Sequence, residues 1–368
     1  MEPIMAFVRP SIPPLPLRWA AETIRGALTV AVRALVPGHV ALLELVTGGW
    51  ISQAIHAAAT LGVADELADE PRSAAELAAA VGADEDALQR LLRLLTSYGI
   101  FTQQRDGRYA LTPMAQPLRR DAEVTLRDAV LLFGSPMHRD HWSYLVESIR
   151  SGEPAAERVR GMPLFDYLQR DREFGELFDR AMASMDTLAL KPLLAAYDFG
   201  RYETIVDVAG GTGTVLTEIL RHTPESRGIL FDLPDVVRSA PRRIEELGLT
   251  DRCAVESGSF FDRVPEGGDA YILKYIVHDW NDRDAGRILD TLRAAMSPHA
   301  RLLLLETILP GHSRPHFGKV LDLEMLVQVT GRERTLSGYR ELLAHHGFTL
   351  LQQVPTTSPV HVIEARPS

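Results

Sequence analysis

Residues 204–213 read Thr-Ile-Val-Asp-Val-Ala-Gly-Gly-Thr-Gly, and this stretch decides the fold of the second half of the chain. Its first five residues form the short apolar run of a buried strand, and a helical pattern over 214–222 follows directly. Glycine in the connecting turn lets the backbone turn tightly and approach a ligand closely. The stretch therefore predicts a strand, a ligand-binding turn and a helix in immediate succession.

Apolar strands alternate with helices along the rest of the second half. The predicted strands are 204–208, 228–231, 254–256, 270–275 and 301–306, with helices near 214–222, 234–247 and 284–297. Such alternation predicts a parallel sheet with helices on both faces. A helix over 337–346 then precedes strands 349–354 and 360–365, whose short link makes them antiparallel. We expect a parallel sheet closed by an antiparallel hairpin.

The part before residue 120 is rich in alanine and leucine and contains helix signals. Gly48–Gly49 predicts the start of a helix that ends at Leu61–Gly62. Ser73 opens a capping box, and Asp84 caps a second helix. A hairpin pattern follows over 99–111. Helix, turn, helix and hairpin together predict a winged-helix arrangement.

A winged helix raises the hypothesis of DNA binding, and charge argues against it. The second helix begins with Asp84, Glu85 and Asp86, and the whole chain carries a formal net charge of -10. An acidic surface repels phosphate backbones. We therefore expect a structural or dimerising role for this region and no nucleic-acid partner.

The length of 368 residues exceeds one ordinary hydrophobic core. The patterns predict four parts: an N-terminal extension over 1–38, a winged-helix dimerisation domain over 39–118, a helical linker and substrate-pocket region over 119–198, and a nucleotide-binding catalytic domain over 199–368. The single cysteine, Cys253, excludes a disulfide framework and fits a reducing, cytoplasmic compartment. Its apolar neighbours predict a buried, inert thiol.

The N-terminal extension combines a proline-rich start, residues 1–16, with an amphipathic pattern over Leu17–Val36. Pro37–Gly38 ends the predicted helix. No long uncharged apolar run is present, so we expect no transmembrane segment. Two hypotheses remain for the helix, namely binding to a membrane surface and docking on this protein or its dimer partner.

A nucleotide site is predicted at the glycine turn. Asp232 ends the next strand, about 20 residues further on, where an acidic side chain binds ribose hydroxyls. No third glycine follows Gly213, which departs from the dinucleotide fingerprint. Ser259–Phe260 ends the third strand, at the edge where an adenine ring would lie. Lys274 lies inside an apolar strand, Tyr271 to Val277, where a buried lysine needs a partner or a ligand. Nicotinamide and methionine-derived nucleotides both satisfy this pattern.

Candidate catalytic groups follow the next strands. His278 comes just after the strand that ends near Tyr275, at the edge where ligands bind in such sheets. Histidine titrates near neutrality and can take a proton from a phenol or alcohol. Glu306 ends the following strand, and Glu333 is a second carboxylate that could orient the imidazole. The alternative for Glu333 is a surface ion pair with a neighbouring arginine. The histidines show no metal-ligand spacing, so no metal is expected.

Five motifs in this order carry a family resemblance. They are Asp207-Val-Ala-Gly-Gly-Thr-Gly213, Phe231-Asp-Leu-Pro234, Leu273-Lys-Tyr-Ile-Val-His-Asp-Trp280, Leu305-Glu-Thr-Ile-Leu-Pro310 and Gly331-Arg-Glu-Arg-Thr335. With them, residues 40–366 resemble the plant-type small-molecule O-methyltransferases, which include the caffeate, chalcone and acetylserotonin enzymes and bacterial natural-product enzymes. The resemblance implies a Rossmann-like α/β methyltransferase domain preceded by an all-helical winged-helix domain that builds a homodimer.

The resemblance also assigns residues to roles. It implies S-adenosylmethionine as the cofactor, bound by Asp207, Gly210, Gly211, Gly213, Asp232, Leu233, Ser259, Phe260 and Lys274. It implies His278 as general base, flanked by Glu306 and Glu333, with a small hydroxylated aromatic molecule as substrate. The acceptor would lie between the thioethers of Met182 and Met325, with Phe178 and Trp142 beside it.

Two positions depart from the family pattern. Ala209 stands where the family begins its turn with a further glycine, and the extra methyl is tolerated if the backbone φ there is negative. Ser259 stands where many members have an aspartate near adenine, so a hydrogen bond is kept and a charge is lost.

The expected reaction is in-line attack of a substrate oxygen on the sulfonium methyl. Three alternatives remain at this point. One is a member of the same fold that binds the cofactor but catalyses hydroxylation or decarboxylation. The others are a ligand-responsive winged-helix regulator and an NAD-dependent dehydrogenase, which the acidic charge and the missing glycine respectively disfavour.

Overall fold

The computed structural model describes residues 15–368, with side chains from Ile24 onward. Most of the proline-rich segment predicted over 1–16 lies outside the described residues. The chain forms two compact units: the first holds Trp19–Asp140 with Asp171–Thr187, and the second is built mainly from His141–Arg170 and Leu188–Ser368. The segment 119–198 contributes to both units. The four-part division of the chain stays a prediction.

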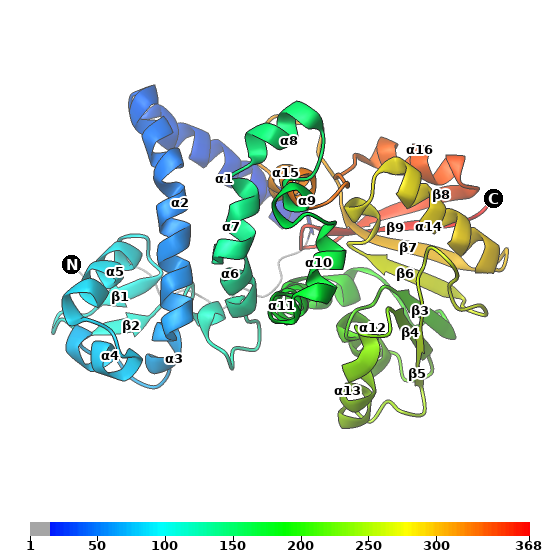
Figure 1. Ribbon diagram of the computed structural model, residues 1–368, viewed down its shortest axis with the longest axis horizontal. Coiled ribbons are helices and arrows are strands. Elements are labelled where there is room, and N and C mark those ends of the chain that lie inside the picture. The colour runs from blue at the N-terminus through cyan, green and yellow to red at the C-terminus, as the bar shows by residue number, and fades with distance from the viewer. Residues whose placement is uncertain (1–14) are drawn as a thin grey trace. The chain divides into compact units, whose positions relative to one another are not determined.

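Between residues 15 and 199, the chain is helical apart from one short hairpin and its connecting loops (Figure 1). Its elements are α1 Leu15–Ala34, α2 Gly38–Leu61, α3 Val63–Glu66, α4 Ala74–Val81, α5 Glu85–Ser97, β1 Phe101–Gln103, β2 Tyr109–Leu111, η1 Gln116–Leu118, α6 Arg127–Gly134, α7 Pro136–Trp142, α8 Leu145–Ser151, α9 Ala155–Arg160, α10 Leu164–Arg170 and α11 Arg172–Ala196.

The later part alternates strands and helices as predicted. Its elements are β3 Thr204–Val208, α12 Thr214–His222, β4 Arg227–Asp232, η2 Val237–Ser239, α13 Ala240–Glu246, β5 Cys253–Ser257, β6 Ala270–Lys274, η3 Val277–Asp279, α14 Asp282–Ala295, β7 Arg301–Thr307, α15 Phe317–Gln328, α16 Leu336–His345, β8 Phe348–Pro355 and β9 Val360–Pro367.

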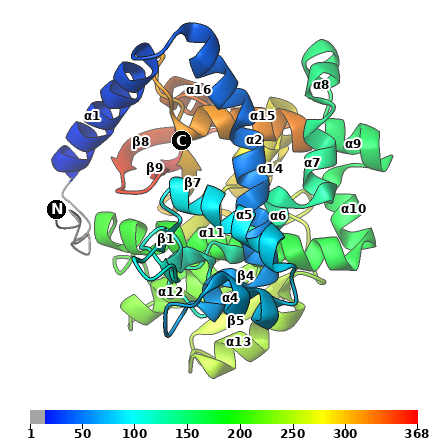
Figure 2. The same ribbon diagram turned by 90° about the vertical axis from the view of Figure 1, so that its left-hand side faces the viewer.

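The winged-helix arrangement is confirmed by α4, α5 and the β1–β2 hairpin. Ser73 accepts from the Glu76 amide, whose side chain in turn accepts from the Ser73 amide, so the capping box forms. The Asp84 side chain accepts from the Ala87 amide and caps α5. The predicted helix start at Gly48–Gly49 is wrong, because α2 runs without interruption from Gly38 to Leu61. Pro37 breaks the chain before α2, and α1 and α2 meet there at a bend of 120° (Figure 2).

The seven-stranded sheet has the order β5-β4-β3-β6-β7-β9-β8. The first five of these strands in space are parallel, and β9 pairs antiparallel with both β7 and β8. The sheet is therefore parallel with an antiparallel hairpin at one side, as expected. The last strand inserts between β7 and its hairpin partner, so β8 forms the edge.

Apolar side chains alternate between the two faces of the sheet and build two cores. Ile205 lies in a cluster with Leu216 of α12 and Ile244 of α13. Its neighbour Val206 lies in the other cluster, with side chains from α14 and α16 such as Leu289. Helices thus cover both sides of this sheet (Figure 1). Cys253 is buried, and burial raises the pKa of its thiol to about 11, in line with an inert role.

In the described part of the chain, no single helix is long and apolar enough to cross a membrane. A bent pair, Ile24–Ala34 with Gly38–Leu61, meets that test by length and composition.

Candidate active site

The strand order brings the predicted site residues to one edge. Strands β3 and β6 are neighbours, while β4 follows β3 in sequence on its other side. The strand order therefore reverses direction between β3 and β6. Open parallel sheets bind ligands outside the carboxyl ends of the strands at such a point. The glycine turn leaves β3 there, and the His278 segment leaves β6.

The glycine turn wraps around the end of β4. The amides of Ala209 and Gly210 both lie within hydrogen-bonding distance of the Phe231 carbonyl oxygen, at 2.7 and 3.3 Å. Gly213 has φ 81° and precedes α12 directly. A Cβ at Gly210 would lie 2.5 Å from Asp207 Oδ2, whereas one at Gly211 would meet nothing within 4 Å. The turn thus has a packed inner side and an open side at Gly211.

Ala209 adopts a left-handed backbone conformation with φ 58°. The condition of a negative φ, under which we expected the alanine to be tolerated, is therefore not met. An L-residue in this region places its Cβ near the carbonyl oxygen at a cost of roughly 1–2 kcal/mol. Ala209 thus adds strain to the turn that a glycine would not.

Asp232 joins the turn to the end of β4. Its Oδ2 accepts from the Gly211 amide at 2.8 Å, and its Oδ1 accepts from the Leu233 amide at 2.6 Å. Burial raises the pKa of this carboxyl, while the two amide hydrogen bonds act in the opposite direction. Asp207, the glycines, Asp232 and Leu233 are therefore brought together as predicted.

The segment after β5 lies beside this turn. Gly258 donates to the Asp232 carbonyl oxygen, which fixes the start of the segment that carries Ser259 and Phe260. The Phe260 ring lies 6.0 Å from the Trp280 ring, edge to face. Trp280 also packs on Phe261 at 4.8 Å. These rings connect the loop after β5 with the loop after β6.

Lys274, at the end of β6, is half-buried and lies at the same edge. Its Nζ sits over the Tyr275 ring, 4.5 Å from the centroid. Tyr275 has φ 53°, which turns the chain sharply out of the strand. Its ring stacks on the His278 imidazole with centroids 5.0 Å apart. The turn thereby presents Lys274 and His278, four residues apart, from one tight segment.

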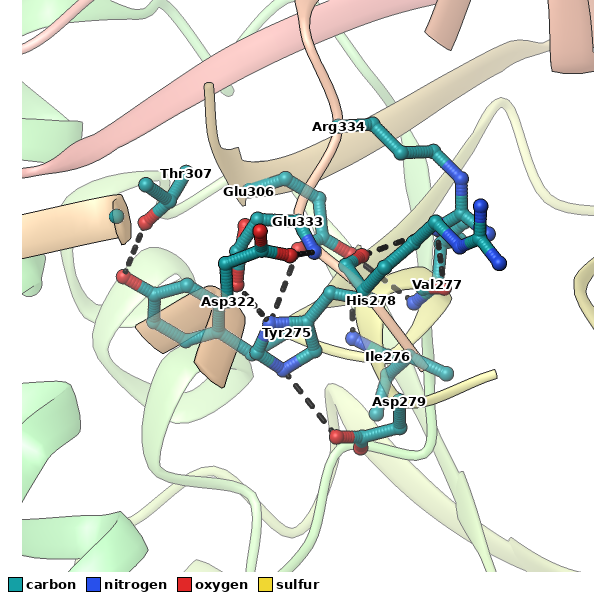
Figure 3. A network of polar contacts seen from close by, with 12 residues as sticks. Tyr275, Ile276, Val277, His278, Asp279, Glu306, Thr307, Asp322, Glu333 and Arg334 are labelled. Atoms are coloured by element: carbon teal, nitrogen blue, oxygen red, sulfur yellow. Dashed lines mark hydrogen bonds and ion pairs between the residues drawn. The ribbon is translucent and has the colours of Figure 1, made fainter. Parts of the chain in front are cut away.

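His278 is buried, with 5% of its surface exposed, and its imidazole is surrounded by carboxylates (Figure 3). Its Nδ1 lies 2.6 Å from Glu333 Oε1 and 4.0 Å from Glu306 Oε2. Its Nε2 lies 3.4 Å from Asp279 Oδ1. The three predicted catalytic residues therefore meet, although they come from η3, β7 and the loop before α16.

Glu306 is fully buried and holds the backbone as well as facing the histidine. Its Oε1 accepts from the amides of Val277 and Ile276 at 3.0 and 3.3 Å. Burial raises the pKa of Glu306 to about 7; the charge of Glu333 also raises it, while His278 and Arg334 lower it. Glu306 thus fixes the turn that carries His278.

Glu333 is also buried, with 3% exposed, so the surface ion pair considered from the sequence is wrong. Its own amide donates to Asp322 Oδ1 of α15 at 2.9 Å. Burial raises the pKa of Glu333 to about 8, the Asp322 charge adds to this, and Arg334 opposes it. The neighbouring Gly331 is required by close packing, because a Cβ there would overlap the His278 carbonyl oxygen.

Arg334 and Asp279 are site residues that sequence reasoning missed. The Arg334 guanidinium donates to the carbonyl oxygens of Val277 and Trp280 at 2.9 and 3.0 Å, and to Asp282 at 2.7 Å. Burial raises the pKa of Asp279 to about 7, and the charge of His278 opposes this. From the sequence motif Gly331-Arg-Glu-Arg, we considered Arg334 only as one of two arginines that could pair with Glu333 on the surface.

Met325 lies on α15, and Trp142 of α7 contacts a side chain of that helix. Met325 is buried on α15, the helix that Asp322 ties to Glu333. Trp142 donates from Nε1 to Glu324 Oε2, next to Met325, at 2.6 Å. Two of the residues predicted to hold the acceptor are thus on, or bonded to, the helix whose Asp322 accepts from the Glu333 amide.

A second polar contact on α15 was also missed. His141 is fully buried; its Nδ1 lies 2.7 Å from Gln328 Oε1, and its Nε2 accepts from Arg160 Nε at 2.9 Å. Because Nε2 is an acceptor, Nδ1 carries the imidazole proton and donates to Gln328. No local sequence pattern connects residues so far apart along the chain.

Met182 and Phe178 are half-buried on α11, within the first compact unit. Their approach to the acceptor stays a prediction. Among the side chains that the structure describes, from Ile24 onward, no group of three or more His, Cys, Asp or Glu residues is arranged to hold a metal ion.

Comparisons with known proteins identify the family. Residues 142–349 match the model of the O-methyltransferase domain, and residues 43–121 match that of the O-methyltransferase dimerisation domain. A phenazine O-methyltransferase from Lysobacter antibioticus is 40% identical over 332 residues, which are 90% of this chain and 97% of the relative. An 8-amino-8-demethylriboflavin N,N-dimethyltransferase from Streptomyces davaonensis is 38% identical over 85% of this chain and 90% of the relative.

A solved structure shows the same fold with a ligand. Human N-acetylserotonin methyltransferase in complex with S-adenosylmethionine superposes with a TM-score of 0.84 at 27% identity, covering 90% of this chain and 98% of the human chain. The O-methyltransferase domain model matches more than half of the chain. The chain belongs to the S-adenosylmethionine-dependent O-methyltransferase family and carries that family's dimerisation domain.

Proposed function

We propose that this chain transfers a methyl group to a hydroxyl, phenolic in the simplest case, of a small aromatic or polyketide-like metabolite, with His278 as the general base. The phenazine relative supports an aromatic acceptor. The single observation that carries the mechanism is the 2.6 Å contact between His278 Nδ1 and Glu333 Oε1.

This contact selects the tautomer that a base requires. When Glu333 is ionised it can only accept, so the proton of the neutral imidazole resides on Nδ1. Nε2 then holds the lone pair that takes the proton of the acceptor hydroxyl, and the carboxylate stabilises the imidazolium that results. Glu306 acts as a positioning residue, because it binds the two amides that precede His278.

The glycine turn fits the cofactor. The open side at Gly211 leaves room for a nucleoside, and the Asp232 carboxylate beside it accepts hydrogen bonds as ribose hydroxyls require. We assign Phe260 and Ser259 to the adenine end, and Asp207 and Lys274 to the remainder of the cofactor. When bound, the cofactor supplies the methyl group on a sulfonium. The chain's own residues align the acceptor, exclude water and remove the proton.

The remaining proposed features concern the acceptor and the compartment. Met182, Phe178, Met325 and Trp142 would hold the aromatic ring, and the polarizable thioethers suit that contact. The cytoplasm is the proposed compartment, since the single cysteine is buried and unpaired.

The test is transfer of a labelled methyl group from S-adenosylmethionine to a panel of phenols. His278→Ala should lower kcat by about 10² to 10⁴, the contribution of a general base, while cofactor affinity is kept. His299→Ala, at an exposed histidine, serves as the matched control and should retain full activity. An active His278→Ala variant with unchanged turnover would disprove the general-base assignment.

Two further outcomes separate the alternatives. Cofactor binding without any labelled product would favour a non-methylating reaction such as hydroxylation or decarboxylation. Aromatic amines belong in the panel, because one relative is an N,N-dimethyltransferase. Transfer to amines that stays unchanged in His278→Ala would favour an N-acceptor, since a neutral amine needs no base before it attacks.

A further inference from the structure

The last turn of α15 carries a buried amide whose donor group is unused. Gln328 is the last residue of this helix and has 5% of its surface exposed. Its Oε1 lies 2.7 Å from His141 Nδ1. Its Nε2 is buried and has no hydrogen-bond partner among the residues that the structure describes. A buried donor without an acceptor costs free energy, so this amide needs an explanation.

A chain of hydrogen bonds fixes the orientation of the amide. The guanidinium of Arg160 in α9 can only donate, and its Nε lies 2.9 Å from His141 Nε2, which therefore accepts. The imidazole proton is then on Nδ1, and Nδ1 donates to Gln328 Oε1. A flipped amide would place its NH2 group against this N–H donor. Arg160 thus determines, through His141, that the NH2 group is the part of the amide left over.

Close packing holds these groups within one compact unit. Helix α9 packs against α15 (Figure 1). His141 has no exposed surface, and the Arg160 guanidinium lies over the Tyr167 ring, 5.2 Å from its centroid. Side chains fixed in this way cannot turn to provide an acceptor for the amide. The missing partner of Gln328 therefore has to come from outside the chain.

The unused donor lies beside residues that we assign to the acceptor. Met325 precedes Gln328 by three positions, so the two side chains occupy neighbouring turns on one side of α15. Trp142 follows His141 directly in the chain and donates to Glu324 of the same helix. The amide is thus a polar group at the border of a region proposed to bind an aromatic ring.

The catalytic end of α15 lies six residues earlier in the helix. Asp322 accepts from the amide of Glu333, the residue that contacts His278. Six residues of an α-helix span about 9 Å along its axis. An acceptor whose hydroxyl reaches His278 would therefore meet Gln328 with a different part of its structure.

We propose that the Gln328 amide binds an oxygen of the acceptor other than the one that is methylated. The substrate class is an aromatic hydroxyl compound that also carries a carbonyl or carboxylate oxygen, because such oxygens accept from an NH2 group. This inference rests on the proposed methyl transfer and specifies its acceptor. Arg160 and His141 are positioning residues, since they act through the amide. An analogue without the oxygen would leave the buried donor unpaired and bind more weakly.

The test compares the binding of matched naphthols to the full-length protein saturated with S-adenosylhomocysteine. The probes are 2-naphthols that carry one acetyl or one carboxylate group at each ring position. Each is compared with the ethyl-2-naphthol of the same substitution, which has similar size but no second oxygen. Isothermal titration calorimetry should show at least one oxygen-bearing probe that binds ten times or more tightly than its ethyl analogue. Its substituent identifies the oxygen as carbonyl or carboxylate, and equal affinities across the panel overturn the proposal.

Two substitutions connect this preference with the amide. Gln328→Glu keeps an oxygen for His141 and replaces the NH2 donor with a second oxygen, so the preference over the ethyl analogue should fall below twofold. Gln328→Met removes the amide without adding a buried charge and should have the same effect. The thermal shift produced by S-adenosylhomocysteine shows that each variant is folded. Gln169→Glu, at an exposed glutamine of α10, is the matched control and should keep the full preference.

Two outcomes separate this inference from its alternatives. A preference that persists in both Gln328 variants overturns it, and the amide donor then serves only the fold, through a buried water. Transfer of a labelled methyl group from S-adenosylmethionine to the tightest probe is measured in parallel. If that probe binds with a preference that depends on Gln328 but receives no methyl group, the proposed function fails while the oxygen-binding site stands.

Discussion

At the scale of single residues, the site concentrates buried acids around one imidazole. Asp279, Glu306 and Glu333 all have pKa values raised by burial, to between about 7 and about 8. Arg334 is the cation that lowers the pKa of both glutamates. Ionising these acids at neutral pH costs stability, and the same ionisation gives His278 its acceptor at Nδ1. Under the proposed general-base role of His278, activity and stability therefore oppose each other here.

Glu306→Gln should show this opposition as a stability gain that depends on pH. The pKa of Glu306 is about 7 in the folded protein against an ordinary 4.5, so its contribution is fully present below pH 4.5 and is lost as pH rises through 7. The glutamine still offers an oxygen to the Val277 amide. We expect the variant to exceed the wild type in unfolding free energy by roughly 1–3 kcal/mol at pH 8, and to match it near pH 4.5.

Urea denaturation at the two pH values measures this difference. Glu70→Gln, at an exposed glutamate, is the control and should leave the free energy of unfolding unchanged. A gain of equal size at both pH values would show that ionisation of Glu306 is not its source.

Ala209→Gly should stabilise the protein, against the usual sense of this substitution. The positive φ of Ala209 strains an alanine, so glycine should raise the free energy of unfolding by about 1 kcal/mol. Ala294→Gly, on the exposed side of α14, is the matched control and should lower it by about the same amount. Chemical denaturation measures the free energy of unfolding of both variants. A lower value than the wild type in both would mean that the left-handed turn is not strained.

At the scale of elements, the His278 turn is held from outside its own sequence. The Arg334 guanidinium spans η3 and the start of α14, and Gly331 lets its loop touch the His278 carbonyl oxygen. The planar guanidinium donates to three acceptors at once, which a lysine ammonium cannot reproduce. We therefore expect Arg334 to act as a positioning residue for His278 through the backbone.

Arg334→Lys should lower kcat about tenfold and leave the KM for S-adenosylmethionine nearly unchanged, because the turn at Gly211 is untouched. Arg334→Gln should in addition shift the pH dependence of kcat to higher pH, since Arg334 lowers the pKa values of Glu306 and Glu333. Steady-state kinetics between pH 6 and 9 separate the two effects. Arg332→Lys, at an exposed arginine, is the control. Identical pH profiles of kcat for Arg334→Lys and Arg334→Gln would refute the effect of the Arg334 charge on the two glutamates.

At the scale of the whole molecule, the reversal of strand order between β3 and β6 creates a ligand site joined to the core of the sheet. Asp232 ends β4, and His278 follows β6, so the proposed cofactor ligand and the proposed base lie at the ends of strands on the two sides of β3. A ligand that binds only the folded state at this edge stabilises the entire unit.

Saturating S-adenosylmethionine should therefore raise the melting temperature. At a concentration one hundred times Kd, the expected stabilisation is about 2.7 kcal/mol. Asp232→Asn should reduce the shift strongly, because the nucleoside loses a charged acceptor. Asp235→Asn, at an exposed neighbour, is the control and should keep the full shift. Equal shifts in both variants would remove Asp232 from the cofactor site.

The sequence by itself determined the elements whose signals are local. The helix over 214–222, the caps at Ser73 and Asp84 and the alternation of strands and helices are all as predicted. These features depend on residues a few positions apart, where capping bonds, glycine turns and apolar periodicity act. The same local patterns placed Asp232, His278 and Glu306 at strand ends, because a parallel sheet aligns those ends at one edge.

Only the tertiary structure decided what depends on contacts between distant residues. The insertion of β9 beside β7, the fork of Arg334, the acceptor role of Glu306 and the Trp142–Glu324 contact join segments that no local pattern connects. The positive φ of Ala209 could not be predicted from its neighbours in sequence either, because the turn is bound to β4 by hydrogen bonds. The raised pKa values belong here too, since burial by the whole fold produces them.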